Sequence, residues 1–499
     1  MEIFHNLVMG FGVAITPIHL LYALIGCLLG TLIGVLPGIG PVATIAMLLP
    51  ITFNLSPVAA LIMLAGIYYG AQYGGSTTAI LVNIPGEASS VVTTIDGHQM
   101  ALQGRAGPAL GIAAIGSFFA GCAATLLISI AAPPLAAIAL EFGPAEYFSL
   151  MVCGLIAAVV LAHGSIIKAI AMVILGLLLG LAGTDVNSGI RRFDFGFQGL
   201  ADGIEFVALS MAIYGLAEVA YNLERKDEQG VVTHTVGRVW PGWADIKTCI
   251  PSILRGTALG SILGVLPGGG ALLASFAAYT LEKKVASPPR SFGQGDIRGV
   301  AAPESANNAG AQTSFIPMLT LGIPSNPTMA MMIGALMIHG IAPGPRVMTE
   351  RPELFWGVVA SMWVGNLMLV ILNLPLVGVW VRFLRIPYRM LFPAIVGFCC
   401  IGTYTINSNV FDVFVMGFFA LFGYLCLKLE CEPAPLILGF VLGPLMEENL
   451  RRALLISRGD PMVFVQEPIS LGFLIASALL LVVVAAPAIR AKREEALQE

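Results

Sequence analysis

Proline and glycine stand together twice in this chain, each time inside an apolar stretch. Residues 34–40 read GVLPGIG, and residues 264–270 read GVLPGGG. Proline removes an amide donor from a helix, and glycine lets other groups approach the backbone closely. We expect each motif to divide a membrane helix, so that free amides attract an anion and free carbonyls hold Na⁺. The candidate contacts in the two motifs are Pro37, Gly38, Gly40, Pro267, Gly268 and Gly269.

For either motif alone, a simple kink that allows close helix packing is the competing interpretation. Duplication of the motif favours a binding site, because transporters built from repeats place paired helix breaks around their substrate.

Hydroxyl and amide side chains follow each motif. Residues 73–78 read YGGSTT and residues 83–86 read NIPG, whereas the second half has two asparagines and then GIPS at 322–325. These segments predict a second broken element in each half. Hydroxyls and amides bind a carboxylate without the cost of burying an unpaired lysine, although hydrogen bonding between helices is the alternative. The candidate substrate or ion contacts are Gly75, Ser76, Thr77, Asn83, Asn307, Asn308, Pro324 and Ser325.

Few charged residues lie near these segments, and each has two interpretations. Glu304 either neutralises a coupling cation or interacts with the dipole at a helix N-terminus. Glu218 and Asp412 are expected at the membrane interface, with a proton relay as the alternative. Arg105 and Arg298 are candidate partners for substrate carboxylates, although arginine in a connector also marks topology.

Signatures of an enzyme are missing from the sequence. It has neither a Gly-rich phosphate loop ending in Lys and Ser or Thr nor a His-Glu-x-x-His motif. Its histidines and cysteines lack the spacing of metal ligands. We therefore expect no enzyme activity, no catalytic residue, no cofactor, and no metal site beyond a Na⁺ site at the same loops.

The composition is typical of a membrane protein with many spans. Of the 499 residues, 57% are hydrophobic and 11% are charged, and the mean hydropathy is +0.89. Because the apolar runs are continuous rather than alternating, we expect an all-α polytopic fold of about 12 transmembrane helices. The formal charge of −4 sits mostly in short connectors, so no nucleic-acid partner is expected. The clearest spans are residues 18–36, 107–132, 148–162, 166–182, 204–221 and 468–489.

The motifs recur in the same order, which indicates two homologous halves. We assign residues 1–221 to a first membrane repeat, 222–248 to a polar linker, 249–465 to a second membrane repeat, and 466–499 to a C-terminal span and tail.

The distribution of positive charge predicts that these halves are inverted. The connector at 50–57 lacks Lys and Arg, whereas the one at 283–290 contains three such residues. Since positive charge favours the cytoplasm, the two connectors are expected on opposite sides of the membrane. Arg490, Lys492 and Arg493 place the C-terminus in the cytoplasm by the same rule.

Together these motifs resemble the large membrane subunit of the tripartite tricarboxylate transporters, the TctA-like family. The resemblance implies a bacterial inner-membrane permease that works with a small four-span membrane subunit and a periplasmic binding protein, which delivers a carboxylate such as citrate. Coupling to a Na⁺ or H⁺ gradient is also implied by the family. Gln312-Thr313 and Ser325 depart from the smaller residues that are usual in it. The matching stretches are residues 34–41, 73–77, 83–86, 96–97, 104–107, 292–295, 299–304, 307–309, 339–340 and 343–345.

We therefore predict a secondary transporter whose broken elements meet near the membrane midplane around an organic anion. A channel in which the same breaks form re-entrant filter loops is the main alternative. A membrane-embedded enzyme and a purely structural subunit are further alternatives, although no nucleophile or acid-base cluster supports the former.

Overall fold

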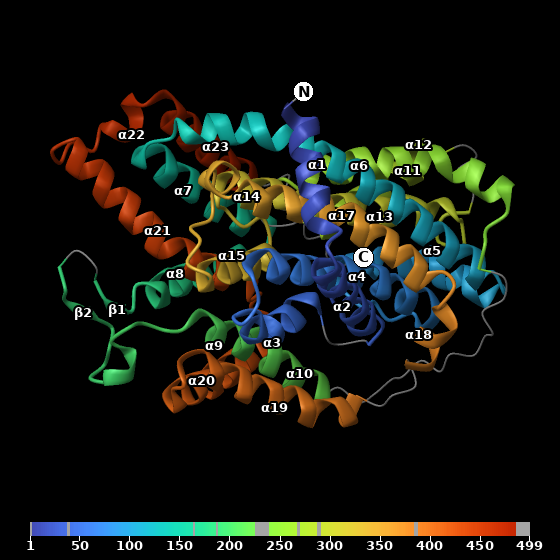
Figure 1. Ribbon diagram of the computed structural model, residues 1–499, viewed down its shortest axis with the longest axis horizontal. Coiled ribbons are helices and arrows are strands. Elements are labelled where there is room, and N and C mark those ends of the chain that lie inside the picture. Colours follow the sequence, from blue (N-terminus) through green and yellow to red (C-terminus); the bar gives the residue numbers. More distant parts are fainter. Residues whose placement is uncertain are drawn as a thin grey trace.

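The chain forms layers of helices with one short β-hairpin at the edge (Figure 1). The computed structural model describes residues 2–36, 40–162, 165–185, 188–224, 239–266, 270–286, 291–383 and 388–485. The helices up to the hairpin are α1 (Glu2–Ala14), α2 (Pro17–Val35), α3 (Pro41–Thr52), α4 (Pro57–Val82), η1 (Ala88–Ser90), α5 (Val91–Leu102), α6 (Ala106–Leu140), α7 (Pro144–Leu161) and α8 (Ile166–Gly180).

The hairpin pairs two antiparallel strands, with Gly183 opposite Arg192. It and the elements up to residue 224 are β1 (Gly183–Thr184), β2 (Arg191–Arg192), η2 (Gln198–Leu200), α9 (Phe206–Ser210), η3 (Met211–Leu216) and α10 (Ala217–Glu224). The remaining helices are α11 (Trp243–Leu263), α12 (Gly270–Val285), α13 (Arg298–Thr313), α14 (Phe315–Leu321), α15 (Pro327–Ile338), α16 (Arg346–Glu350), α17 (Pro352–Asn373), α18 (Val377–Phe383), α19 (Tyr388–Asn407), α20 (Val410–Lys428), α21 (Ala434–Ile456), α22 (Val463–Gln466) and α23 (Pro468–Ala485).

The prediction of an all-α membrane protein is confirmed, because the described residues of each expected apolar run coincide with helical segments. Within the described residues, five helices are long and apolar enough to cross a membrane. Shorter apolar helices, including α3, α7, α8, α15 and α23, accompany them. The total of about 12 crossings stays a prediction. The five long segments are Pro17–Val35, Ala106–Leu140, Phe206–Glu224, Pro352–Asn373 and Val410–Lys428.

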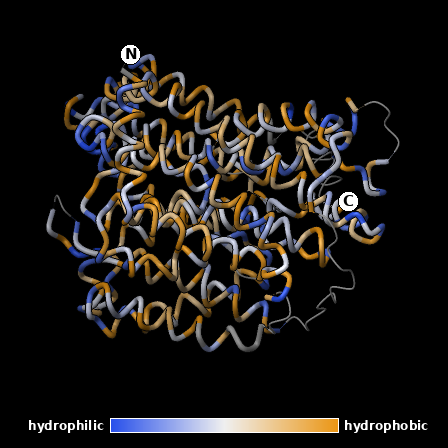
Figure 2. Tube along the Cα trace, turned by 45° about the vertical axis from the view of Figure 1, so that its right-hand side comes forward, coloured by the Kyte–Doolittle hydropathy of each residue, from blue (hydrophilic) through white to orange (hydrophobic). Residues whose placement is uncertain are grey.

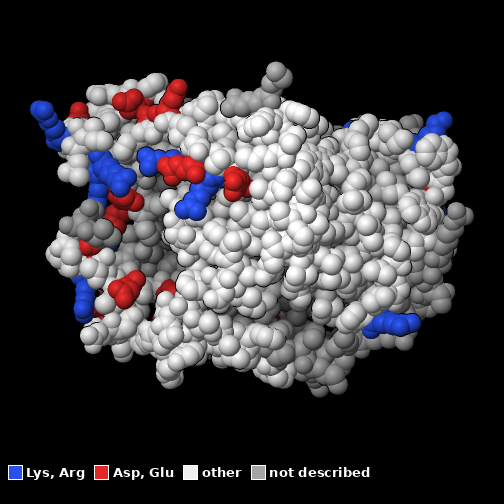
Figure 3. Space-filling view, viewed as in Figure 1, with Lys and Arg blue, Asp and Glu red and all other residues white. Residues whose placement is uncertain are grey.

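The surface has the uneven polarity of a protein that lies in a bilayer. Apolar residues run along most helices in Figure 2, and the polar residues gather at helix ends and connectors. Figure 3 shows acidic and basic side chains concentrated on the left-hand half of the face, whereas the right-hand half is almost uncharged apart from a few basic side chains near its edge. Near the hairpin, Arg192 binds Glu447 at 2.7 Å and Arg451 binds Asp185 at 2.9 Å. A broad uncharged surface suits contact with lipid chains.

Glycines bring α2 and α4 into direct backbone contact. A Cβ atom added at Gly30 would lie 2.3 Å from the carbonyl oxygen of Ile67, which leaves no room for a side chain. The same arrangement joins α11 to α13, where a Cβ atom at Gly260 would lie 2.2 Å from the carbonyl oxygen of Ala306. Small residues spaced by four positions are typical of closely packed membrane helices. Both pairs of helices lie next to a Pro-Gly motif.

The helices are interrupted at both Pro-Gly motifs, as predicted. Helix α2 ends at Val35 and α3 begins at Pro41, whereas α11 ends at Leu263 and α12 begins at Gly270. Residues 37–39 and 267–269, which include the predicted contacts Pro37, Gly38, Pro267, Gly268 and Gly269, lie outside the described residues.

The second broken element predicted in the first half is interrupted at residues 83–86, whereas its residues 73–78 stay helical. Helix α4 continues through them to Val82, and the break follows at Asn83, whose φ of 61° is left-handed. Gly74 instead allows close packing, because a Cβ atom there would lie 2.3 Å from the carbonyl oxygen of Thr31 on α2. The asparagine pair of the second half also lies inside a continuous helix, α13.

The boundaries assigned to the two repeats remain predictions. Helix α11 begins at Trp243, inside the predicted linker, and residues 225–238 of that linker lie outside the described residues. The basic residues of the C-terminal tail, from Arg490 onward, also lie outside them.

Candidate functional site

A cavity of about 400 Å³ lies between the two interrupted helices. Gly40 and Pro41, at the start of α3, form one part of its wall, and Ala271 and Leu272, at the start of α12, form another. The described flanks of both Pro-Gly motifs therefore border one space, although they are far apart in the sequence. Residues from α4, η1 and the segment before it, η3, α10, α15 and the start of α21 complete the wall.

Four long helices begin at this cavity. Besides α3 and α12, helix α15 contributes Asn326, Pro327 and Thr328 to the wall, and helix α21 contributes its first residue, Ala434. The first turn of a helix has amides without partners and carries partial positive charge, so these ends together favour an anion. One of these amides is already used, because the Asn326 side chain accepts a hydrogen bond from Met329 N at 3.0 Å.

Carboxylates also border the cavity and oppose a bound anion. Glu87, Glu218 and Glu432 belong to its wall, together with the hydroxyls of Tyr68 and Tyr214. A negative substrate in this space therefore requires neutralisation of at least part of this charge.

A network of buried polar side chains lies behind the cavity and joins residues that are far apart in the sequence. Both oxygens of Glu304 accept hydrogen bonds, one from Ser76 at 2.5 Å and the other from Thr93. Ser89 donates toward Asn307 Oδ1 at 2.7 Å. Because α13 supplies Glu304 and Asn307 whereas α4, η1 and α5 supply the hydroxyls, the network links both predicted repeats.

Some predicted contacts lie at this cavity and its network. Gly40 lines the cavity, and among the described residues a Cβ atom added there would meet nothing within 4 Å. Ser76 and Asn307 belong to the network behind it. Gly75 lies at its edge, where an added Cβ atom would be 2.8 Å from the Cγ atom of Glu87.

Other predicted contacts make structural hydrogen bonds or end a helix. Thr77 donates to Tyr73 O within α4, at 3.4 Å, and Asn83 is an exposed C-cap. Asn308 donates to Ser117 on α6 at 2.7 Å, and Ser325 donates to Ser314 O at 3.3 Å. Pro324 is buried next to Ser325 and does not line the cavity.

The two candidate arginines are engaged in ion pairs and do not line the cavity. Arg105 lies 3.3 Å from Asp245, and Arg298 lies 2.6 Å from Asp296. Burial raises the pKa of Asp296, but hydrogen bonds from Arg298 and Ser291 outweigh it and hold that pKa below its ordinary value. Both arginines therefore stabilise connectors between helices.

Comparison with known proteins assigns the family. The model of the tripartite tricarboxylate transporter TctA family matches residues 20–438, which include every residue of the cavity wall. The chain belongs to the TctA family. It is therefore a component of a tripartite tricarboxylate transporter and a multi-pass membrane protein, and the predicted resemblance is confirmed.

Two proteins of Agrobacterium vitis resemble this TctA-family chain. An uncharacterized 52.8 kDa protein in the TAR-I ttuC' 3' region is 58% identical over 499 residues, which cover 100% of this chain and 99% of that protein. An uncharacterized protein in the TAR-II ttuC' 3' region is 59% identical over 240 residues, which cover 48% of this chain and 99% of that protein. No solved structure matches the chain.

Sequence reasoning missed several residues of the TctA-family cavity. Gln72 lies one turn before Ser76 on α4, and Glu87 and Ser89 come directly after the break at residues 83–86. The positions of Glu87 and Ser89 next to a helix break could have identified them as site residues. The sequence around Tyr68 gives no such signal, because an aromatic side chain is equally typical of a buried core position.

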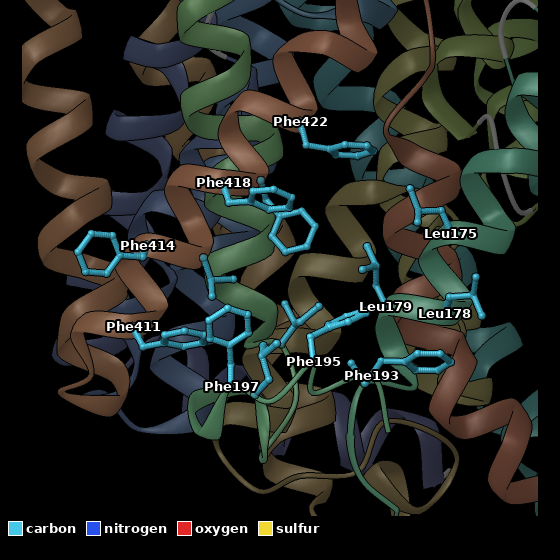
Figure 4. A pocket seen from close by; sticks show the side chains of 15 residues that line it. Leu175, Leu178, Leu179, Phe193, Phe195, Phe197, Phe411, Phe414, Phe418 and Phe422 are labelled. Atoms are coloured by element: carbon cyan, nitrogen blue, oxygen red, sulfur yellow. The ribbon is translucent and has the colours of Figure 1, made fainter. Parts of the chain in front are cut away.

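A second, larger pocket of this TctA-family protein has a different chemistry. It measures about 850 Å³, and hydrocarbon side chains line it throughout. In Figure 4, Phe193, Phe195 and Phe197 extend from the loop after β2 toward leucines of α8 and aromatic residues of α20. The rings of Phe197 and Phe411 lie 6.2 Å apart. A charged carboxylate finds no hydrogen-bond donor there, so the smaller polar cavity is the better candidate site.

Proposed function

We propose that this TctA-family protein is the permease subunit that imports a small organic di- or tricarboxylate, such as citrate, across a bacterial inner membrane. A periplasmic binding protein delivers the substrate, a small four-span membrane subunit completes the complex, and a Na⁺ or H⁺ gradient drives uptake. The C-terminus lies in the cytoplasm, and the two repeats are inverted. The family supports the tripartite arrangement, and the charge pattern of the connectors supports the orientation.

One observation carries the choice of substrate class: the helices α3, α12, α15 and α21 all begin at a single cavity, two of them at the Pro-Gly motifs. Backbone amides at the starts of α3, α12 and α15, with the side chains of Asn326 and Thr328, can surround carboxylate groups on several sides. Such donors are already oriented before the ligand binds, so little ordering cost opposes binding.

A side chain placed at Gly40 tests the cavity directly. Its φ of −76° suits any residue, and no atom of the described residues other than its chain neighbours lies within 4 Å of a Cβ atom added there. Gly40→Leu should fill part of the cavity without distorting the fold and abolish uptake of labelled citrate by the complete complex in cells. Gly12→Leu is the matched control, because Gly12 on α1 also has nothing within 4 Å and does not line the cavity.

Normal uptake with an unchanged KM in the Gly40→Leu variant would remove this cavity from the transport route. A panel of mono-, di- and tricarboxylates identifies the substrate class, and saturable uptake driven by an ion gradient distinguishes a transporter from a channel, which would instead give single-channel currents.

A further inference from the structure

A small polar cavity of about 10 Å³ lies between α4, α6 and α17. None of the described residues that line it borders the larger cavity of the candidate site, so the two are separate spaces. Hydroxyl and amide side chains, each at most 6% exposed, form the polar part of its wall. They are Tyr73, Ser76 and Thr77 from α4, Ser117 from α6 and Asn373 from α17.

Two polar atoms at this small cavity have no hydrogen-bond partner among the described residues: the hydroxyl oxygen of Tyr73 and Oδ1 of Asn373. Both side chains are buried, with 3% and 6% of their surface exposed. The orientation of the Asn373 amide is fixed, because its Nδ2 donates to Leu369 O at 2.9 Å and reversal would bring two oxygens together there. Buried polar atoms without a partner are costly, so both atoms favour a polar ligand in the space beside them.

The size and the chemistry of the small cavity fit one water molecule. A buried water needs a space on the order of 10–15 Å³ and two to four polar partners. The wall supplies such partners from three helices, and it carries no formal charge, so it suits a neutral ligand. Water both donates and accepts hydrogen bonds, which matches a hydroxyl that can donate and an amide oxygen that can only accept.

We infer that a buried water molecule bridges Tyr73 on α4 to Asn373 on α17. It accepts the hydrogen of the Tyr73 hydroxyl and donates one of its own to Asn373 Oδ1. Its second hydrogen goes to Ser76 Oγ, which can accept because Ser76 gives its own hydrogen to Glu304 at 2.5 Å. The water thereby extends the network of Glu304 from α13 and α4 to α17, and it joins the two predicted repeats a second time.

Hydroxyl-radical labelling of the purified full chain in detergent detects such a water. X-ray irradiation forms radicals from a bound water, which oxidise the side chains next to it, whereas radicals formed in bulk solvent do not reach buried side chains. In the wild-type protein, mass spectrometry should show Tyr73 labelled several times faster than Phe355. This reference residue is an aromatic side chain of α17 that is 0% exposed and does not line the small cavity.

Asn373→Leu tests the bridge, because leucine removes the acceptor and fills space beside Tyr73. Labelling of Tyr73 should fall to the level of Phe355. Asn366→Leu is the matched control: Asn366 is also buried on α17, and its amide also has no partner among the described residues, but it does not line the small cavity. Labelling of Tyr73 should be unchanged in that variant.

Thermal unfolding gives the second measurement. Tyr73→Phe and Asn373→Leu should each shift the unfolding temperature, and the shift of the double variant should differ from their sum, because both substitutions remove the same bridge. The unfolding transition also shows whether each variant is folded.

The wild-type comparison alone can overturn the water site, which it does if Tyr73 is labelled no faster than Phe355. Labelling of Tyr73 that persists in a folded Asn373→Leu variant overturns it as well, and additive shifts of the unfolding temperature exclude a bridge between the two residues. Neither measurement involves a substrate, so the water site stands or falls independently of carboxylate uptake.

Discussion

At the scale of single residues, Glu304 connects side chains that the sequence keeps apart. Its surface is 1% exposed, and its two oxygens bind the hydroxyls of Ser76 and Thr93. The sequence left open whether this carboxylate meets a cation or the start of a helix. Its position inside α13, rather than at the first turn, favours a role in holding α4, α5 and α13 together.

We predict that Glu304→Ala destabilises the protein by about 1–3 kcal/mol, because two buried hydroxyls lose their acceptor. Glu304→Gln, which keeps one acceptor oxygen, should cost less. Thermal unfolding in detergent measures both, and Glu350→Ala is the control because Glu350 lies exposed at the end of α16. Equal stability of Glu304→Ala and Glu350→Ala would contradict this role for Glu304.

At the scale of elements, glycine contacts fix the helices that position the cavity. Helices α2 and α4 touch through backbone atoms, and α11 and α13 do the same in the second half. The axes of these pairs cannot separate without loss of many close contacts. The interrupted ends that follow α2 and α11 are therefore held near the network.

We predict that Gly30→Ala and Gly260→Ala each destabilise the protein by about 1–3 kcal/mol, since the added methyl group meets a backbone carbonyl on the facing helix. Gly417→Ala on α20 is the matched control, because a Cβ atom there meets nothing within 4 Å. The unfolding temperature in detergent reports all three. If Gly30→Ala and Gly417→Ala unfold at the same temperature, direct backbone contact between α2 and α4 is refuted.

A carboxylate on α5 holds the loop that precedes α13. Asp96 Oδ1 accepts hydrogen bonds from the amides of Gly293, Gly295 and Asp296 at 2.8–2.9 Å, and its Oδ2 accepts one from Tyr279 at 2.9 Å. One buried side chain thus supplies the acceptors for three backbone donors. Through it, α5 of the first predicted repeat is fastened to the second.

We predict that Asp96→Ala increases hydrogen–deuterium exchange at Gly293, Gly295 and Asp296 by roughly tenfold or more, because their amides lose hydrogen bonds to a charged acceptor. Asp96→Asn keeps an acceptor oxygen and should give a smaller increase. Peptides from α17 serve as the internal reference. Unchanged exchange in the loop of Asp96→Ala would show that other contacts hold it.

At the scale of the whole molecule, the two predicted repeats meet across the cavity rather than side by side as separate bodies. Three sets of hydrogen bonds join the two predicted repeats. Glu304 accepts from Ser76, Asn307 accepts from Ser89, and Asp96 accepts from Gly293. The charge pattern predicts that these halves are inverted in the membrane, with connectors 50–57 and 283–290 on opposite sides.

Cysteine labelling from one side of the membrane tests this inversion. Asn54 and Lys284 are exposed in equivalent places of the two halves. In intact cells, a membrane-impermeant maleimide should label Asn54→Cys, whereas Lys284→Cys should react only after the membrane is opened. Labelling of the unmodified protein measures the reaction of its native cysteines, all of which are buried or half-buried. Labelling of both positions from the same side would exclude an inverted repeat.

Much of the fold was predictable because its signals are local. Continuous apolar runs specify membrane helices, and proline with glycine ends a helix wherever it occurs. The predicted broken element of the first half is interrupted at residues 83–86, but residues 73–78 stay helical. A glycine such as Gly74 looks the same in the sequence whether it breaks a helix or lets another helix approach. Only the neighbour, here Thr31 on α2, distinguishes these uses.

The sequence by itself determined the class of protein, the two Pro-Gly interruptions and the family, since each depends on residues close together in the chain. The tertiary structure decided which polar groups share the cavity and which merely pair with a neighbour. Asn307 and Asn308 illustrate this: they are adjacent, yet one meets Ser89 at the cavity wall and the other meets Ser117 on α6. Successive residues of a helix point in different directions, so the packing of the surrounding helices determines what each of them contacts.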